Sequence, residues 1–256
     1  MKVGEGGAKT ENPYLEMLKK AQNDSTSITT TESLKDYGLD NVDCDICGNT
    51  GYLVWQEDGI AYSKECECMA KRRSLRRIQT SGLSEMLSRY TFDAYEVPDA
   101  KRLQIKHLAK RFAEDDSGWF YLSGQSGSGK THICTAICAR LIERGKNVYY
   151  MKWRDESRQL KALMNTEEVE KPLDRLKEIP VLYIDDFFKG GCGDADLRLA
   201  FEIINARYND SRLRTVISSE MTIEQVLSAD EALGGRIYER SRGYILSAPS
   251  ENWRIK

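Results

Sequence analysis

From Phe92 onward, the chain alternates between short apolar runs and longer segments with the 3.6-residue period of amphipathic helices. Apolar runs of this kind are typical of buried strands, and their alternation with helices predicts a parallel sheet covered by helices. Strands are expected at residues 119–123, 147–152, 180–184, 214–218 and 243–247. Helices are expected at residues 130–144, 155–164, 194–209 and 222–227. The pattern predicts an α/β domain with a five-stranded parallel sheet between helices.

The region before this domain has a different pattern. Residues 1–40 are polar, and no apolar period in them is long enough to bury a face. We expect a mostly flexible tail with at most one short helix at residues 14–20. Residues 41–82 hold two close cysteine pairs followed by a basic run, and they are interpreted as a small separate module. The α/β domain is expected to occupy residues 83–256.

Composition narrows the class of protein. The 256 residues include 38 Lys and Arg against 40 Asp and Glu, so the formal net charge is −2. This balance gives no global reason to expect nucleic-acid binding, and a polyanion would have to meet a local basic patch. No stretch reaches the ~18 uninterrupted apolar residues of a membrane helix, and the N-terminus lacks the apolar region of a secretory signal. We therefore expect a cytoplasmic protein without a membrane partner.

A glycine-rich segment, GQSGSGKT, follows the first expected strand of the α/β domain and opens a helix. It fits the pattern G-x-x-x-x-G-K-[ST], which requires this context. Glycines let backbone N–H groups surround a phosphate, and the helix N-terminus adds partial positive charge. Lys130 is expected to reach the β- and γ-phosphates of ATP, and the Thr131 hydroxyl to bind Mg²⁺. The predicted nucleotide site comprises Gly124, Gln125, Ser126, Gly127, Ser128, Gly129, Lys130, Thr131 and His132.

The third expected strand ends in two carboxylates, Asp185 and Asp186. Asp185 is expected to hold Mg²⁺, directly or through water, and Asp186 to orient or deprotonate the attacking water. The alternative is a strand that merely ends in a solvated acidic turn. Together with Lys130, the acidic pair predicts an ATP hydrolase.

With both motifs in place, the chain resembles AAA+ helicase loaders of the DnaC/DnaI type, in the form carried by phages and prophages of Gram-positive bacteria. The resemblance extends from about residue 40 to the C-terminus. The segments that carry it are residues 44–52, 66–68, 124–132, 183–188, 217–220 and 230–240. It implies an AAA+ core, and the full helical lid that follows many such cores is expected to be absent, because only about a dozen residues follow Gly243. It also implies an ATP-dependent protein that delivers a hexameric replicative DNA helicase onto single-stranded DNA.

The resemblance implies roles for further residues. The end of the fourth strand carries a polar sensor in this family, usually Asn, and Ser219 and Glu220 occupy that place. Arg236 stands where the family has an arginine finger, which acts on ATP in a neighbouring subunit, and Arg240 competes for this role. A finger acting in this way implies self-association as a ring or spiral, either in the free protein or only on the helicase. Arg254 is the candidate for a second sensor.

Four of the seven cysteines form the two close pairs, and an odd count in a cytoplasmic chain favours a metal over disulfides. Cys44, Cys47, Cys66 and Cys68 offer four thiolates, enough for one tetrahedral structural Zn²⁺. The segment is too short and polar to build its own core, so a metal would supply much of its folding free energy. Four unrelated reduced thiols and an iron–sulfur cluster are the alternatives. The resemblance implies that this module grips the helicase.

Two segments that follow expected strands place aromatic side chains beside cations. Aromatic faces stack on bases and cations attract phosphates, a combination typical of single-stranded DNA contacts. The candidates are Lys152, Trp153, Arg154, Phe188 and Lys189. Packing or a solvated rim is the alternative for each segment. The basic run at residues 71–77 is expected to be a solvated helix face or a linker contact.

Three functions remain open from the sequence. The leading one is the helicase loader, with slow hydrolysis that a partner or DNA stimulates. The second is a transposition helper of the IstB type, which shares the core but binds duplex DNA and a transposase. The third is a nucleotide-bound adaptor without useful hydrolysis, suggested by Asp186 in place of the commoner Glu and by Glu220 in place of Asn.

Overall fold

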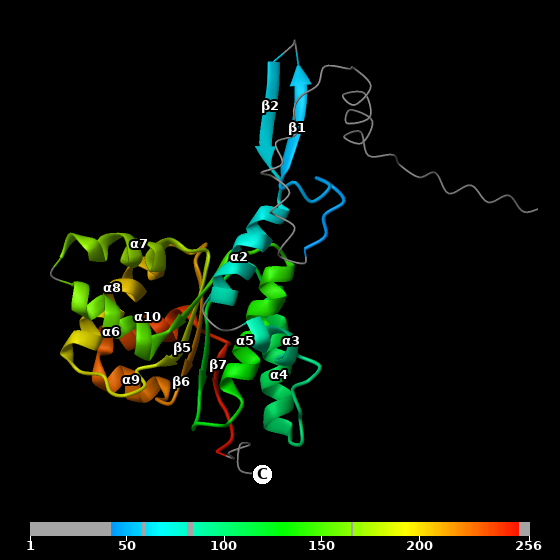
Figure 1. Cartoon of the computed structure of the whole chain (residues 1–256). Helices are drawn as coiled ribbons and strands as arrows, with labels where there is room; N and C mark the ends of the chain where they lie inside the picture. The colour runs from blue at the N-terminus through cyan, green and yellow to red at the C-terminus, as the bar shows by residue number, and fades with distance from the viewer. Residues whose placement is uncertain (1–41, 58–59, 81–83, 165, 251–256) are drawn as a thin grey trace, which may run out of the picture. The chain divides into compact units, whose positions relative to one another are not determined.

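The computed structural model describes residues 42–57, 60–80, 84–164 and 166–250 (Figure 1). The chain divides into two compact units, the first up to Met69 and the second from Ala70. The expected flexible tail with its short helix, and the sensor candidate Arg254, lie outside the described residues. None of the described helices is long and apolar enough to cross a membrane.

The first unit contains an antiparallel hairpin of β1 (Tyr52–Glu57) and β2 (Ile60–Glu65). Trp55 and Tyr62 pair across the two strands, and their rings stack with centroids 5.7 Å apart. Most side chains of the hairpin are exposed. The exposed apolar ones are Tyr52, Val54, Ile60 and Tyr62. A two-stranded hairpin without a buried face is marginally stable by itself, so the unit depends on the cysteine-bearing turns at its base.

The second unit is built on a parallel sheet with strand order β4-β5-β6-β3-β7, which confirms the predicted five strands. The strands are β3 (Phe120–Ser123), β4 (Val148–Lys152), β5 (Val181–Phe187), β6 (Arg214–Ser219) and β7 (Ile245–Ser247). Every residue of β3 and β6 is buried, as expected for parallel strands covered on both faces. Because β3 is parallel to its neighbours β6 and β7, the loop that follows it lies at the carboxyl edge of the sheet, where α/β folds bind ligands.

Helices cover both faces of this sheet. On one face lie α4 (Ala100–Glu114) and α5 (Lys130–Glu143), and on the other lie α6 to α10 (Figure 1). These are α6 (Trp153–Leu163), α7 (Glu170–Glu178), α8 (Asp194–Tyr208), α9 (Ile223–Ala229) and α10 (Glu231–Arg240). Before α4 lie α2 (Cys68–Thr80) and α3 (Ser84–Arg89), and the 3₁₀ turn η2 (Glu167–Val169) precedes α7. Between β7 and residue 250 the structure has no further helix.

Local sequence explains where several helices begin. The Asp99 side chain accepts from the Arg102 N–H at 2.8 Å and caps α4. Thr222 and Gln225 form a reciprocal capping box at the start of α9. Each cap satisfies N–H groups that have no partner within the helix, which stabilises a helix by about 1 kcal/mol.

The structure differs from the predicted elements in several places, and it adds α4, which was not among the predicted helices. Strand β5 continues through the acidic pair to Phe187, because a bulge keeps it paired with β6 beyond Ile184. Helix α6 begins at Trp153, two residues earlier than predicted. Helices α7 and α10 were not among the predicted helices, because Pro172 and the pair Gly234 and Gly235 weaken their helical patterns.

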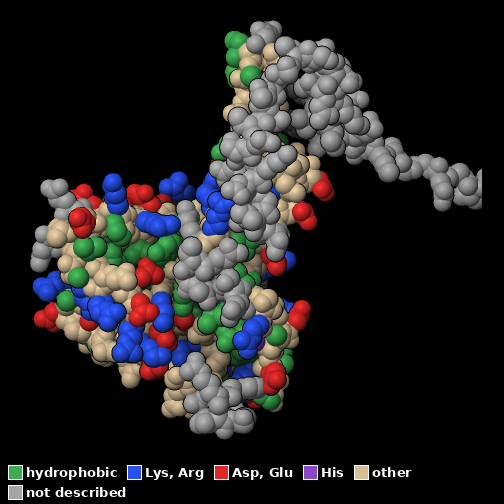
Figure 2. Space-filling model, in the orientation of Figure 1, with side chains coloured by type: hydrophobic (Ala, Val, Ile, Leu, Met, Phe, Trp, Pro, Cys, Tyr) green, Lys and Arg blue, Asp and Glu red, His purple; other side chains and the backbone are tan. Residues whose placement is uncertain are grey.

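The basic run forms part of α2, and it is not uniformly solvated. Arg72 is 1% exposed, and Leu75 packs against the apolar cluster between α4, α5 and the sheet. Acidic and basic side chains are interspersed over the visible face of the second unit (Figure 2). This distribution agrees with the near-neutral net charge, which gives no large field of one sign.

Candidate functional site

The glycine-rich loop connects β3 to α5 and folds tightly at the start of that helix. Gly124 has a φ of +151° and Gly129 a φ of +91°, values that residues with a Cβ rarely adopt. A Cβ on Gly124 would also lie 2.9 Å from the Ser128 Oγ. The loop therefore has the conformation that only glycines permit, and such a loop presents backbone N–H groups to a phosphate.

The Lys130 side chain lies inside this loop. Its Nζ donates to the backbone oxygens of Gly124 at 2.7 Å and Gln125 at 2.9 Å. Burial lowers the pKa of Lys130, while the negative charges of Asp186 and Glu220 act in the opposite direction. The two hydrogen bonds hold the ammonium group within the loop, where it can bind a negatively charged phosphate.

Asp185 is the centre of a buried hydrogen-bond network and is 5% exposed. Its carboxylate accepts from the hydroxyls of Ser218 at 2.5 Å, Tyr183 at 2.7 Å, Tyr150 at 3.1 Å and Thr131 at 3.3 Å. Burial and the negative charge of Asp185 raise the pKa of both tyrosines, so their hydroxyls stay protonated as donors. The donors from β4, β5, β6 and α5 stabilise a buried carboxylate at one fixed position.

This geometry fits the predicted magnesium site. The Thr131 hydroxyl and an Asp185 oxygen lie 3.3 Å apart. Two neighbouring ligands of an octahedral Mg²⁺ with bonds of about 2.1 Å are separated by about 3 Å. The two oxygens could therefore bind one ion with little movement.

A β-bulge in β5 makes the side chains of Asp185 and Asp186 point in different directions. Between Ile184 and Phe187, β5 advances by three residues while the paired part of β6 advances by two. Asp186 lies in this bulge with a φ of +56°, and its N–H donates to the Ser218 Oγ at 3.0 Å. Bulges commonly re-aim side chains beside active sites. Here Asp185 points into the buried network. Asp186 instead belongs to a charged cluster with Lys130, Lys189 and Glu220.

Lys189 links Asp186 to Glu220. Its Nζ lies 2.9 Å from Asp186 Oδ2 and 3.5 Å from Glu220 Oε1. Burial lowers the pKa of Lys189, but the hydrogen bonds and charges of the two carboxylates outweigh that effect and raise the pKa overall. Lys189 was predicted to contact DNA from its place beside an aromatic residue. In this structure its ammonium group pairs with these two carboxylates, and a DNA contact of Lys189 stays a prediction.

The two candidates for the sensor position lie in different environments. The Ser219 Oγ donates to the Phe187 backbone oxygen at 2.8 Å and accepts from the Met221 N–H at 3.0 Å, and Ser219 is fully buried. Its hydroxyl therefore links the end of β6 to the end of β5 by a hydrogen bond. Glu220 is exposed and points its carboxylate toward Lys189, so of these two candidates Glu220 has the side chain that faces the charged cluster.

The two arginine-finger candidates differ in how their guanidinium groups are held. Arg236 donates to Asn205 Oδ1 at 2.9 Å and lies over the ring of Phe201. Arg240 lies over the ring of Trp119 and donates to the backbone around the end of α8 and the loop that follows it. Its acceptors are the oxygens of Tyr208, Asp210, Ser211 and Leu213. Arg240 thus has a structural role in fixing that loop, and a finger role for Arg236 stays a prediction.

The aromatic residues predicted to stack on DNA bases are buried. Trp153 is 1% exposed and Phe188 is 4% exposed, and their ring centroids lie 5.4 Å apart in the core on the α6 side of the sheet. We therefore correct the prediction for these two residues, because neither ring offers a face to a base. Lys152 and Arg154 are exposed and stay candidates for phosphate contacts.

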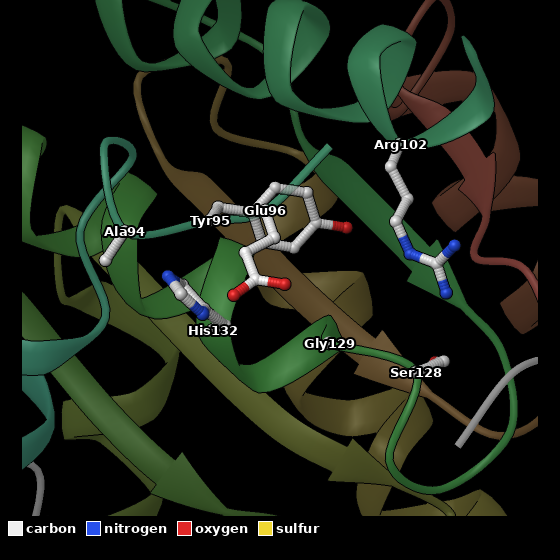
Figure 3. A pocket seen from close by; sticks show the side chains of 7 residues that line it. All are labelled: Ala94, Tyr95, Glu96, Arg102, Ser128, Gly129 and His132. Atoms are coloured by element: carbon white, nitrogen blue, oxygen red, sulfur yellow. The ribbon is translucent and has the colours of Figure 1, made fainter. Parts of the chain in front are cut away.

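A cavity of about 200 Å³ adjoins the phosphate loop (Figure 3). The segment before α4 supplies part of its lining, and Figure 3 shows the Tyr95 ring, the Glu96 carboxylate and the His132 ring grouped there. The full lining is Ala94, Tyr95, Glu96, Arg102, Ser128, Gly129 and His132. Apart from the loop residues and His132, the lining was not predictable from sequence, because the segment before α4 carries no motif.

His132 has a defined place in this cavity. Its Nε2 hydrogen-bonds with the Thr91 backbone oxygen at 2.8 Å, and its ring stacks on Tyr90 with centroids 4.8 Å apart. Burial lowers the pKa of His132, which favours a neutral ring that donates to Thr91. His132 therefore ties the start of α5 to the segment before α4, and it shows no arrangement for acid–base chemistry.

The four cysteines of the first unit converge on one point. Their sulfur atoms all lie within 4.8 Å of one another, and the closest pairs are Cys47 with Cys68 at 3.6 Å and Cys44 with Cys66 at 3.7 Å. Four thiolates around one tetrahedral Zn²⁺ with bonds of about 2.3 Å are separated by about 3.8 Å. The arrangement thus fits zinc, and it brings together the four residues that the spacing predicted.

The environment of the Cys47 sulfur favours a thiolate, whereas burial raises the pKa of Cys66. Burial raises the pKa of Cys47, but the Gly51 N–H and the other cysteines outweigh this and lower it to about 7. The Gly51 N–H donates to the Cys47 sulfur at 3.3 Å. A Cβ on Gly51 would lie 2.6 Å from the Met69 Sδ, so this turn depends on glycine for close packing.

Comparison with protein families and curated proteins places the chain among ATP-binding proteins. The family described as IstB-like ATP binding protein matches residues 58–245. The uncharacterized protein YqaM of Bacillus subtilis strain 168 is 34% identical over 218 residues, which cover 78% of this chain and 67% of YqaM. The phage-like element PBSX protein XkdC of the same strain is 30% identical over 222 residues, 80% of this chain and 81% of XkdC. The replicative helicase loader DnaC of Escherichia coli K12 is 24% identical over 200 residues, 74% of this chain and 79% of DnaC.

Two solved structures confirm the fold. The crystal structure of DnaI superposes with a TM-score of 0.53 at 23% identity, covering 66% of this chain and 92% of that one. The crystal structure of the DnaC helicase loader gives a TM-score of 0.55 at 20% identity, covering 64% and 99%. The second unit therefore has the fold of DnaI and of the DnaC helicase loader.

Proposed function

The chain belongs to the IstB-like ATP-binding protein family, and from this we propose that it is an ATP-dependent loader that delivers a hexameric replicative DNA helicase onto single-stranded DNA. The observation that carries the proposal is a converged four-cysteine site in a separate unit that precedes an AAA+ core with an ordered phosphate loop. The similarity to the helicase loader DnaC supports it.

In the proposed reaction, ATP binds in the phosphate loop and Lys130 meets the β- and γ-phosphates. Thr131 and Asp185 would hold Mg²⁺, which neutralises phosphate charge when it is bound. Asp186, on the outer side of the bulge, orients the attacking water and accepts its proton. Because its carboxylate already pairs with Lys189, the water has to compete with the ammonium group for this carboxylate, and slow hydrolysis follows.

The first unit would grip the helicase. Zinc bound by the four cysteines would hold the turns that carry the hairpin. Its exposed apolar side chains, among them Val54 and Ile60, offer a contact surface that this unit does not bury. In the proposed complex, the helicase would cover this surface.

In the complex, the loader would contact single-stranded DNA and its own neighbours. Lys152 and Arg154 are exposed after β4 and can meet phosphates without sequence preference. Arg236 would reach ATP in an adjacent subunit, which requires it to leave Asn205 and Phe201. This arrangement needs a ring or spiral, formed at the latest on the helicase.

Native mass spectrometry of the protein mixed with hexameric replicative helicase, with and without ATP, tests the proposal. We expect a defined complex that responds to nucleotide and carries one zinc per loader chain. Lys130→Ala should abolish the response to ATP, and Cys66→Ser should prevent complex formation while ATP binding remains. A wild-type protein that binds ATP and zinc but forms no complex with helicases of the host or of a phage would overturn the loader proposal.

The family match also favours a second candidate, a transposition helper of the IstB type. Such a helper would bind duplex DNA and a transposase. Fluorescence anisotropy with matched single-stranded and duplex oligonucleotides separates the two functions. A strong preference for duplex DNA would favour the helper, and a preference for single strands would favour the loader.

A nucleotide-bound adaptor is the third candidate, and Asp186→Asn addresses it. If the protein is a loader, we expect this variant to bind ATP normally but to lose most of its steady-state hydrolysis. An ATPase rate that Asp186→Asn leaves unchanged, with and without DNA, would favour the adaptor.

A further inference from the structure

Four charged side chains form a cluster beside the phosphate loop: Lys130, Asp186, Lys189 and Glu220. Lys189 bridges the two carboxylates at 2.9 and 3.5 Å. The charges of Asp186, Glu220 and Lys189 all act on the Lys130 ammonium group. The cluster contains two cations and two carboxylates, so its charges balance before any nucleotide is bound.

The backbone holds Lys189 in this position. Asp186 and Phe188 have φ values of +56° and +61°, in the left-handed region that residues other than glycine seldom occupy. The Lys189 N–H donates to the Asp186 backbone oxygen at 2.9 Å, which turns the chain back on itself. Phe188 is 4% exposed and anchors the turn in the core. Left-handed backbone of this kind is unfavourable for residues other than glycine and persists where the surrounding structure enforces it.

A carboxylate at position 220 is unfavourable for a site that receives ATP. The triphosphate brings several negative charges to Lys130, and both Glu220 and Asp186 would repel them. The ammonium group of Lys189 lies between the two carboxylates and offsets this repulsion. Its side chain is 33% exposed, so part of its charge also faces the open side of the cluster.

We propose that Lys189 is a positioning residue of the nucleotide site, which neutralises Glu220 and Asp186 and thereby lets the site accept the γ-phosphate of ATP. The inference rests on the proposed ATP site and adds a residue that neither sequence motif includes. It makes Lys189 and Glu220 a compensated pair, in which the loss of the lysine alone is worse than the loss of both charges.

Equilibrium binding of fluorescent ATP and ADP analogues with Mg²⁺ tests this proposal. We expect Lys189→Met to weaken ATP binding about tenfold and ADP binding by less, because ADP lacks the γ-phosphate. Lys189→Arg should keep most of the ATP affinity, and Glu220→Gln should restore most of it in the Lys189→Met background. In steady-state hydrolysis, Lys189→Met should raise KM without lowering kcat, because the substitution also removes the ammonium group that competes with water for Asp186.

The control is Lys177→Met, because Lys177 forms a comparable ion pair with Glu202 at 2.6 Å between α7 and α8. This variant should bind both nucleotides like the wild type. An ATP affinity of Lys189→Met within twofold of the wild type would overturn the inference, as would a double variant no better than Lys189→Met.

Two further results keep the test decisive. If Lys189→Met does not fold, Glu220→Gln alone still tests the idea. We expect it to bind ATP at least as well as the wild type, and a tenfold loss would instead make Glu220 a direct ligand. A wild-type protein that binds no ATP would contradict the proposed function, whereas wild-type binding with an unaffected Lys189→Met variant contradicts only the role of Lys189.

Discussion

The Tyr183 hydroxyl donates to the Asp185 carboxylate at 2.7 Å, two residues away on the same face of β5. Because strand side chains alternate, residues at positions i and i+2 point the same way. Tyr183 is fully buried, and Asp185 is almost fully buried. The strand therefore supplies both a candidate metal ligand and one of the donors that hold it.

We expect Tyr183→Phe to destabilise the protein, because it removes a hydrogen bond to a buried charge. Bonds of this kind contribute about 1.5–3 kcal/mol to the free energy of unfolding. Urea denaturation measures the loss, and Tyr238→Phe is the control because Tyr238 is exposed. A loss below about 0.5 kcal/mol for Tyr183→Phe would show that the remaining donors satisfy Asp185.

Two adjacent glycines of α10 are expected to respond in opposite ways to alanine. A Cβ on Gly234 would lie 2.7 Å from the backbone N and Cα of Leu227 in α9, whereas a Cβ on Gly235 meets nothing within 4 Å. Gly234→Ala should therefore destabilise the protein by about 1–3 kcal/mol. Gly235→Ala should stabilise it by about 0.5–1 kcal/mol through helix propensity.

Thermal unfolding of both glycine variants tests this pair. The same substitution at neighbouring positions gives opposite shifts in melting temperature if α9 and α10 pack as closely as the structure shows. Equal shifts would mean that this packing is looser.

Zinc removal is expected to affect the first unit selectively. The purified protein should contain one zinc per chain by elemental analysis, and Cys66→Ser should lose it. Cys192→Ser is the control, because Cys192 lies in the second unit outside the cluster. ATP binding should survive the loss of zinc, since the phosphate loop belongs to the other unit. A metal content that Cys66→Ser leaves unchanged would contradict the four-cysteine site.

Stability is expected to fall as the pH rises through the range in which Glu156 titrates. Burial raises the pKa of Glu156 to about 7, although the Tyr149 hydroxyl donates to its carboxylate at 3.0 Å and acts in the opposite direction. In the unfolded chain this carboxyl ionises with the ordinary glutamate pKa of 4.5. Between these values the folded state binds more protons, so Glu156 contributes stability at low pH that is lost as the pH approaches 7.

Glu156→Gln should remove this contribution. We expect the difference in unfolding free energy between wild type and variant to shift in favour of the variant from pH 5 to pH 8, as measured by urea denaturation. A difference that stays constant over this range would show that Glu156 is ionised in the folded state throughout.

The contiguous motifs were predictable from sequence, because short-range chemistry determines them. The glycine spacing that predicted the phosphate loop is the spacing that its left-handed backbone requires. The apolar runs predicted five parallel strands, since strands covered on both faces must be apolar along their whole length. The cysteine spacing likewise predicted a cluster that the structure brings within 4.8 Å.

Contacts between elements were not predictable in the same way. Trp153 and Phe188 follow strands beside cations, and that pattern does not distinguish a ring that stacks on DNA from one that packs in the core. The bulge in β5 was also not predictable from sequence, because one extra residue in a strand leaves the local apolar pattern unchanged. It nevertheless directs Asp185 and Asp186 into different environments.

The strands of the second unit, the phosphate loop and the candidate metal ligands were predictable from sequence, because each is recognised within a short contiguous segment. The side chains that surround those ligands come from distant segments, so they became known only from the folded structure. Tyr150 and Ser218 reach Asp185 from two other strands, and Lys189 and Glu220 meet across the ends of β5 and β6. The order of strands in the sheet creates these pairings, and strand order arises from packing over the whole domain.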